Sequence, residues 1–269
     1  MVEKNSYILG TDTNELSRLE LQHDVWLSEA KKGWDKANFN KGQTILDLGC
    51  GPGSCSKELA KIVDTYGKII SIDKSAIFIN HIKKKLQKEY SNIEPIESTF
   101  DDMNLQSSSI DGIFCRWSLA WISNPKEIIE KATLALKEKG RIVFHEYYDW
   151  STHQIYPYRK NINKCIQQAL KSFKDSEFEI DIGAYLPQIL NDLGLKIVSS
   201  RLMPKLASPK TNEWMWPKTF YLNYFPKLVK MGYLNKNDVE KSLNDINELE
   251  NLSYARICCP ILIEIIAEK

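Results

Sequence analysis

Short apolar runs alternate with longer amphipathic stretches through the first half of the chain. An apolar run predicts a buried strand, and apolar residues at helical spacing predict a helix between two strands. Alternation with short connections predicts a parallel sheet joined by crossover helices. Two more strands are predicted further along the chain, so the full set lies at residues 45–48, 69–72, 93–96, 110–114, 141–145, 195–199 and 261–266.

The remaining segments are predicted to be mainly helical. Residues 1–42 carry Leu16, Leu19, Trp26 and Leu27 near helical spacing and predict an N-terminal helical cap. Two aromatic-rich segments interrupt the alternation and predict a helical lid over an apolar pocket. We therefore expect one domain over residues 1–269, with a cap at 1–42, a core at 43–147, lid insertions at 148–183 and 207–255, and a last strand at 256–269.

The composition narrows the class of protein. The chain of 269 residues carries 36 Lys and Arg against 35 Asp and Glu, a formal net charge of +1, which argues against a dedicated nucleic-acid binder. No apolar stretch is long enough for a transmembrane helix, and the first residues lack the apolar core of a signal peptide. The six cysteines form no CxxC pattern, so we expect free thiols and no metal site. We expect a cytoplasmic monomer or homodimer that has no membrane partner.

A glycine-rich loop, 47–54, follows the first predicted strand and precedes a helix. Its glycines allow a sharp turn and a close approach of a ligand to the backbone, and the helix start offers free N–H groups. Asp73 ends the second predicted strand, where a carboxylate can accept hydrogen bonds from both ribose hydroxyls. The spacing is G-x-G-x-G rather than the dinucleotide pattern G-x-G-x-x-G, and Asp47 favours a positively charged ligand over a pyrophosphate.

The segment ILDLGCGPGS resembles motif I of the class I S-adenosylmethionine-dependent methyltransferases. The segments IDGIFCRWSLAWI, LKEKGRIVFHEY and ILIEIIAEK resemble the fourth-, fifth- and seventh-strand segments of that family. The resemblance implies an α/β, Rossmann-like fold: a seven-stranded, mostly parallel sheet with an antiparallel last strand, helices on both faces and a helical lid. It implies S-adenosyl-L-methionine as the cofactor and no need for a covalent enzyme intermediate.

The resemblance also implies where the cofactor binds. Asp73 and Lys74 would meet the ribose, and Tyr7, Arg18 and Gln22 of the cap would lie over the methionine end. The family's adenine-reading acid falls on Thr99, so either the acid is displaced to Asp101 or Asp102, or Phe100 packs on the ring. The other expected cofactor contacts come from the glycine loop and the end of the fourth strand: Asp47, Gly49, Cys50, Gly51, Gly53, Cys115, Arg116 and Trp117.

The sequence offers fewer candidates for a catalytic base and for substrate contacts than for cofactor contacts. His145 and Glu146 end the fifth strand, at the ligand-binding edge of such sheets, although neighbours in a strand face opposite sides. Either is a candidate base if the acceptor needs one. The expected substrate pocket comprises Trp121, Tyr147, Trp150, Trp214, Trp216 and Tyr221.

We expect methyl transfer to O, N or C of a small, partly apolar or aromatic acceptor. The alternatives are a methyltransferase acting on RNA or protein, and a non-catalytic S-adenosylmethionine-binding protein. A nicotinamide dehydrogenase is disfavoured by the glycine spacing and by Asp47.

Overall fold

The computed structural model describes residues 13–269, which divide into two compact units. Unit 1 comprises the described residues up to Trp26 together with 149–180 and 204–261. Unit 2 comprises 27–148, 181–203 and 262–269. The predicted insertions thus fall almost entirely within unit 1, and the predicted core falls within unit 2.

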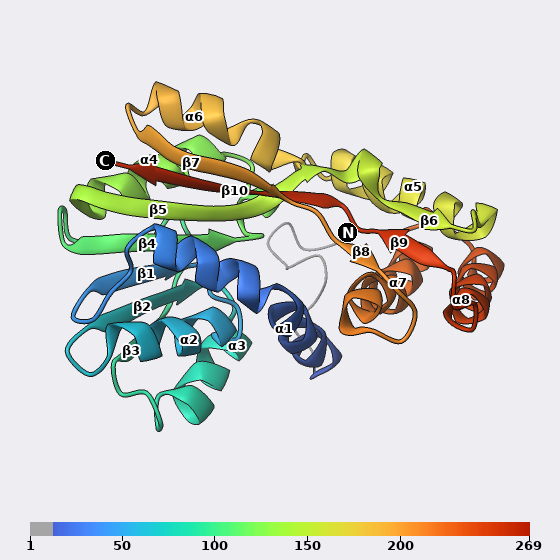
Figure 1. The fold of residues 1–269 in the computed structure, drawn as a ribbon, viewed down its shortest axis with the longest axis horizontal. Helices are drawn as coiled ribbons and strands as arrows, with labels where there is room; N and C mark the ends of the chain where they lie inside the picture. The colour runs from blue at the N-terminus through green and yellow to red at the C-terminus, as the bar shows by residue number, and fades with distance from the viewer. Residues whose placement is uncertain (1–12) are drawn as a thin grey trace. The chain divides into compact units, whose positions relative to one another are not determined.

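Unit 2 is built on a seven-stranded sheet in the order β3-β2-β1-β4-β5-β10-β7. Neighbouring strands from β3 to β5 run parallel, whereas β10 and β7 are antiparallel (Figure 1). The predicted mostly parallel sheet with an antiparallel last strand is therefore confirmed. The strands are β1 Thr44–Leu48, β2 Lys68–Asp73, β3 Ile93–Glu97, β4 Ile110–Arg116, β5 Leu136–Asp149, β7 Lys196–Met203 and β10 Ile261–Glu268.

Helices cover both faces of this sheet. Figure 1 shows α1 and α2 in front of the strands and α4 behind them. The long helix α1 begins in unit 1 and ends in unit 2. The helices are α1 Thr13–Lys36, α2 Ser54–Val63, α3 Ala76–His81 with a π turn at Ile82–Leu86, α4 Pro125–Ala135 and α6 Leu186–Asp192, with 3-10 turns at Leu119–Trp121 and Ile182–Ala184.

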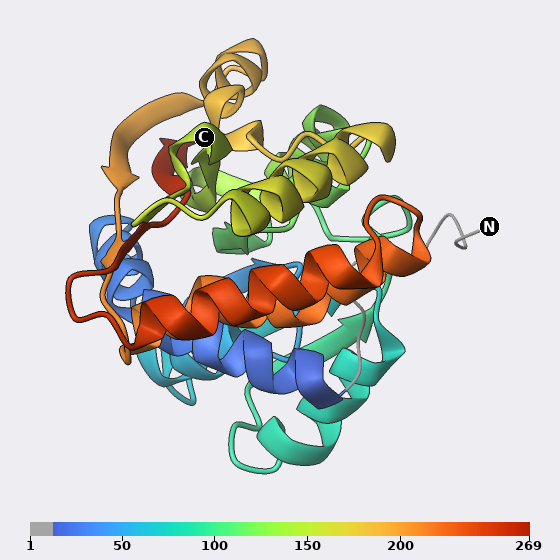
Figure 2. The ribbon, with the colours of Figure 1, turned by 90° about the vertical axis from the view of Figure 1, so that its right-hand side faces the viewer.

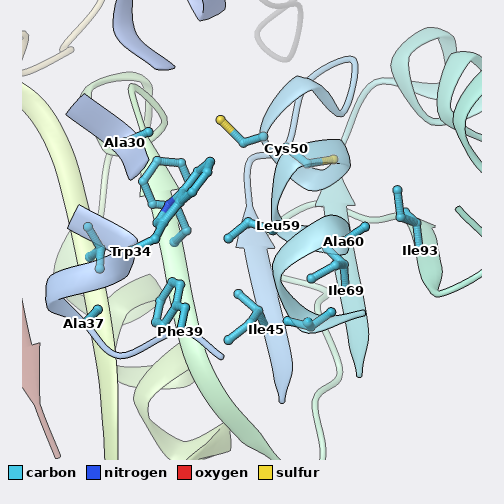
Figure 3. Close-up of a cluster of buried hydrophobic side chains, with 14 of the residues drawn as sticks. Ala30, Trp34, Ala37, Phe39, Ile45, Cys50, Leu59, Ala60, Ile69 and Ile93 are labelled. Atoms are coloured by element: carbon cyan, nitrogen blue, oxygen red, sulfur yellow. The ribbon is translucent and has the colours of Figure 1, made fainter. Parts of the chain in front are cut away.

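A cluster of buried apolar side chains packs α1 and α2 against the strands of the main sheet. Trp34 of α1 is fully buried, and its ring lies 5.3 Å from that of Phe114 of β4 in an edge-on arrangement. Leu59 of α2 and Ile45 of β1 belong to the same cluster (Figure 3). Removing a buried aromatic ring of this kind costs about 3–5 kcal/mol. This packing fixes the strands whose carboxyl ends form the site described below.

Besides the first part of α1, the described residues of unit 1 form three helices and a second, small sheet. The helices α5 Lys160–Asp175, α7 Asn212–Lys230 and α8 Lys236–Glu250 pack against one another (Figure 2), and a 3-10 turn lies at Trp150–Thr152. The sheet has the order β6-β9-β8 and is antiparallel, with β6 Gln154–Tyr156, β9 Arg256–Cys258 and β8 Leu206–Ala207.

Two predictions about these segments are corrected. The first insertion also contains the strand β6, and β8 ends at the first residue of the second insertion; strands of three and two residues are too short to leave a periodic signal. The predicted last strand at 256–269 is in fact β9 and β10, which belong to different sheets. Pro260 lies between them and has no N–H to donate to a ladder, so it interrupts the pairing.

All six cysteines are free thiols, five of them buried, as predicted. Among the described residues, no helix has both the length and the apolar character needed to cross a membrane.

Candidate active site

The loop between β1 and α2 turns on three glycines in the left-handed region. Gly49, Gly51 and Gly53 have φ values of 75°, 52° and 86°, which residues with a side chain rarely adopt. The N–H groups of Gly49 and Cys50 both donate to the carbonyl of Ile72 at 2.9 and 3.0 Å. The loop is therefore held against the end of β2, and α2 begins directly after it.

The space around the loop differs from one glycine to the next. A Cβ at Gly49 would lie 2.0 Å from Oγ of Ser118 and 3.3 Å from the Phe100 ring. A Cβ at Gly51 would meet nothing within 4 Å. The loop is thus closed on its Gly49 side and open in front of Gly51, which leaves room for a ligand against the main chain.

Asp73 faces this open turn from the end of β2. Its Oδ2 accepts a hydrogen bond from the Gly51 N–H at 2.9 Å, and its Oδ1 accepts one from the Ser75 N–H at 2.8 Å. Burial raises the pKa of the carboxyl, and the two backbone donors oppose that rise. Each carboxylate oxygen has a second lone pair, so Asp73 can also accept the hydroxyls of a bound ribose.

Asp47 is buried and bonded to the first turn of α2. Its Oδ2 accepts from Oγ of Ser56 at 2.6 Å, and Ser56 accepts in turn from Oγ of Ser71 at 2.8 Å. Burial raises the pKa of Asp47 to about 6, while the Ser56 hydrogen bond and the charge of Arg116 lower it. Asp47 therefore joins β1, β2 and α2, and its negative charge lies behind the loop, where it favours a cationic ligand.

The residues after β3 lie beside the loop. The half-buried Phe100 ring approaches Gly49, as the Gly49 geometry shows. Thr99 is exposed and its hydroxyl donates to Asp102 at 2.7 Å, while Asp101 and Lys74 are exposed. The ring of Phe100 therefore lies against the glycine loop.

The thiols at this edge are not nucleophiles. Burial raises the pKa values of both Cys50 and Cys115 well above the ordinary thiol value. The thiolate is the reactive form of cysteine, so both residues serve as packing.

The end of β4 holds a cation against aromatic rings. The Arg116 guanidinium lies 4.9 Å from the Trp117 ring and 6.0 Å from that of Phe114. Trp117 has φ 52° and its N–H donates to the His145 carbonyl at 3.0 Å. Its ring is 6.1 Å from that of Tyr147. The structure thus brings Arg116, Trp117 and Tyr147 together at the carboxyl edge of β4 and β5.

His145 and Glu146 face opposite sides of β5, as predicted for strand neighbours. His145 is fully buried and its Nε2 lies 2.8 Å from Oε2 of Glu264 in β10. Glu264 also accepts from Arg201 at 2.7 Å. Burial lowers the pKa of His145 despite Glu264, so the ring is neutral at pH 7 and Nε2–H is the donor. A Cβ at Gly33 of α1 would lie 2.4 Å from Glu264, so His145 is enclosed beneath α1.

Glu146 lies on the other face, under the turn after β4. Its Oε1 accepts from the N–H groups of Ser118 and Leu119, both at 3.0 Å. Its Oε2 is buried and has no hydrogen-bond partner among the described residues. Burial raises the pKa of Glu146 to about 8, against the two backbone donors, so the carboxyl is mainly protonated at pH 7. Of the two candidate bases, Glu146 is the one that contacts the turn beside the glycine loop.

Ser118 was not predicted from the sequence and connects these parts. Its Oγ lies within hydrogen-bonding distance of the carbonyls of Leu48 and Gly49, both at 3.4 Å, while its N–H is held by Glu146. No local pattern identifies it, since its partners are about 70 and 28 residues away.

In unit 1, Arg18 and Gln22 form a buried polar network. Arg18 donates to Glu15 at 2.8 and 2.6 Å and to Oε1 of Gln22 at 2.9 Å. The same Gln22 oxygen accepts from the Trp216 indole at 3.0 Å, and Asn223 donates to Glu15 at 2.6 Å. The structure therefore joins two predicted cofactor contacts to a predicted substrate contact. Tyr7 lies outside the described residues.

The other predicted aromatic contacts of unit 1 pack chiefly on one another. Trp214 and Tyr221 are fully buried, and the Tyr221 hydroxyl lies 2.5 Å from Nε2 of His153. Trp150 meets His153 edge-on at 5.6 Å. Burial lowers the pKa of His153 to about 4, so it stays neutral. In unit 2, Trp121 is half-buried in the 3-10 turn after β4.

The fold is that of the class I S-adenosylmethionine-dependent methyltransferases. The glycine turn and Asp73 are suited to that cofactor, because the loop leaves open space before Gly51 and a carboxylate beside it. The chain belongs to the family described as a methyltransferase domain, whose model matches residues 39–211.

Individual proteins resemble the chain more distantly. It is 26% identical over 192 residues to a phosphoethanolamine N-methyltransferase of Triticum aestivum, covering 66% of this chain and 35% of that protein. Among the first curated relatives that it matches, the chain spans less than half of their length.

Two solved structures share the fold. A putative methyltransferase of Bacillus halodurans superposes with a TM-score of 0.61 at 13% identity, covering 90% of this chain and 99% of that one. A geranyl diphosphate C-methyltransferase of Streptomyces coelicolor, solved with S-adenosyl-L-homocysteine, gives 0.58 at 12% identity, covering 91% and 77%.

Proposed function

We propose that the protein transfers the methyl group of S-adenosylmethionine to a small, partly apolar or aromatic acceptor. The observation that carries the proposal is the open turn at Gly51 with the Asp73 carboxylate bonded to its N–H, in a chain of the methyltransferase family. Relatives named for phosphoethanolamine and geranyl diphosphate act on small molecules, which supports an acceptor of that size.

The cofactor, when bound, supplies a methyl group activated by a positively charged sulfur. The chain's own residues supply position and charge. Asp73 would hold the ribose and Phe100 the adenine, while the buried charge of Asp47 favours a cation near the loop. Holding two reactants in line at near-attack distance is the main catalytic task in such a transfer.

The geometry bears on which group could remove a proton from the acceptor. His145 is neutral but enclosed beneath α1 and bonded to Glu264, so it would need the sheet to open before reaching a substrate. Glu146 is as fully buried as His145, but it contacts the Ser118 turn directly, and above its pKa of about 8 it is ionised and can accept a proton. We assign Glu146 to this task if the acceptor is a hydroxyl or carbon acid, and to no proton transfer if it is an amine or thiolate.

The aromatic content of unit 1 supports an apolar or aromatic acceptor. We propose that Trp216, which shares a polar network with Arg18 and Gln22, is a candidate acceptor contact in unit 1. In unit 2, Tyr147 beside Trp117 is another. Tyr221 and Trp214 are fully buried, so we assign them to the packing of unit 1 rather than to the acceptor.

Calorimetric titration tests the proposal's first step. S-adenosyl-L-homocysteine is expected to bind and NAD is not. If NAD binds and S-adenosyl-L-homocysteine does not, the proposed methyltransferase activity is contradicted and a dehydrogenase activity is favoured. A protein that binds S-adenosylmethionine and never consumes it with any acceptor would be a binding protein instead.

A further inference from the structure

Unit 1 contains a cavity of about 400 Å³ that the methyl-transfer site does not account for. It lies between the segment around β6 and the first turns of α5, both within unit 1. Its volume falls within the range of about 300–1,000 Å³ that small-molecule sites occupy. Its lining includes Trp150, Tyr156, Tyr158, Arg159, Asn163 and Gln167.

The lining is aromatic on one side and amide-rich on the other. Trp150 is buried, whereas Tyr156 and Tyr158 are exposed at the cavity. Asn163 and Gln167 lie one turn apart on α5, and their side-chain amides have no hydrogen-bond partner among the described residues. Aromatic walls fit a flat apolar body, and free amides fit polar substituents at its rim.

The charge of the lining is one-sided. Among its described residues Arg159 is the one side chain with a full charge at pH 7, and no Asp or Glu lines the cavity. Arg159 has a loose ion pair at 3.9 Å with Glu248, whose side chain is 69% exposed. Exposed pairs of this kind contribute little, so a ligand's acidic group can replace Glu248 at modest cost. A guanidinium binds carboxylate or phosphate through two parallel hydrogen bonds.

His153, also in the lining, adds no charge. Its Nδ1 is 3.0 Å from the Cys258 carbonyl and its Nε2 is 2.5 Å from the Tyr221 hydroxyl, so both ring nitrogens are engaged within unit 1. It forms a fixed wall of the cavity, and the attraction for an anion comes from Arg159.

We propose that this cavity binds a flat, apolar small molecule carrying one acidic group, with the rings of Trp150 and Tyr158 against its body and Arg159 paired with the acid. The proposal goes beyond methyl transfer, because binding here needs neither the methyl donor nor the glycine loop. Carboxylate and phosphate share the chemistry that Arg159 recognises, and the experiment separates them.

Calorimetry on the full chain, without a methyl donor, tests the proposal with 1-naphthoate, 1-naphthyl phosphate and the uncharged 1-naphthamide. At least one acid is expected to bind tenfold or more tightly than the amide, and the tighter acid identifies the preferred group. Equal binding of all three, or binding of none, would overturn the proposal. Separate titration with S-adenosyl-L-homocysteine reports on the methyl-donor site, so failure there is distinguishable from failure here.

Matched variants locate the binding. Arg159→Gln is expected to abolish the preference for the acid, whereas Lys160→Gln, which removes the same charge from an exposed neighbour, should retain it. Tyr158→Ala should lower the binding affinity for the acid at least fivefold. Tyr254→Ala removes a ring of unit 1 with nearly equal exposure, 66% against 65%, outside the cavity, and should leave binding unchanged. If each control behaves like its partner variant, the ligand lies elsewhere.

Discussion

At the scale of single residues, Asp73 carries most of the expected cofactor recognition. Asp73→Asn keeps the size of the side chain but replaces one acceptor oxygen by a donor. We expect S-adenosyl-L-homocysteine binding to weaken by about 1–3 kcal/mol, the scale of hydrogen bonds lost at a buried site. Calorimetry measures the change.

Asp35→Asn is the matched control for Asp73→Asn, because Asp35 is exposed on α1. It should bind as the unaltered chain does. Equal binding by Asp73→Asn would mean that the ribose is held elsewhere.

Glu146 makes the stability depend on pH. Its pKa is raised from 4.5 to about 8 in the folded chain, so between these values the folded state holds a proton that the unfolded state has lost. Its contribution to the free energy of unfolding is therefore full below about pH 4.5 and falls as pH rises through 8. Glu146→Gln keeps an uncharged acceptor for the Ser118 and Leu119 N–H groups at every pH.

We expect Glu146→Gln to match the unaltered chain near pH 5 and to exceed its stability at pH 9, by on the order of 2 kcal/mol or more. Denaturant unfolding at both pH values measures the difference. Glu130→Gln, which removes an exposed carboxylate from α4, should change neither value appreciably. An unchanged pH profile in Glu146→Gln would show that Glu146 is charged when folded.

Some features of the site could be predicted from the sequence residue by residue, and others could not. The glycine turn, Asp73 and the opposite orientation of His145 and Glu146 were predictable, because residue type and strand alternation are local properties. The hydrogen bond between His145 and Glu264 was not, since it joins residues 119 positions apart. The same holds for Ser118, whose role depends on three strands meeting at one edge.

At the scale of elements, the loop between β1 and α2 has little room for an added side chain at Gly49. Gly49→Ala would place a Cβ 2.0 Å from Ser118 in a backbone with φ 75°, so loop and turn must separate. We expect S-adenosyl-L-homocysteine binding to fall at least tenfold, since a displacement near 1 Å at such a site costs that much or more. Calorimetry again measures it.

Gly42→Ala controls for backbone strain alone. Gly42 also has positive φ, 82°, but an added Cβ meets nothing within 4 Å. It should lose some stability and keep its affinity. If both variants lose similar affinity, the loss is caused by general destabilisation of the fold and not by displacement of the loop.

The hydrophobic pattern predicted some strands and missed others. Most strands of the main sheet were predictable because they contain apolar runs long enough to recognise, whereas β3, with the sequence IEPIE, gives a weaker signal. β6 and β8 were missed because strands of three and two residues are defined by their partners in β9, which comes some 50 to 100 residues later. Pro260, visible in the sequence, could have indicated the break before β10.

At the scale of the whole molecule, the balance of 36 basic against 35 acidic residues agrees with a small acceptor rather than a polyanion. The two units divide the labour in the proposed account. Unit 2 contains the glycine loop and Asp73, and unit 1 contains the aromatic residues of α7 and the cavity beside Arg159.

Transfer of a labelled methyl group from S-adenosylmethionine tests the central claim most directly. The protein is incubated with the labelled donor and with separate small-molecule, RNA and protein fractions of a cell extract, beside Asp73→Asn. We predict label in the small-molecule fraction, strongly reduced by the substitution. Label in the RNA or protein fraction alone, or in none of the three, would contradict the account.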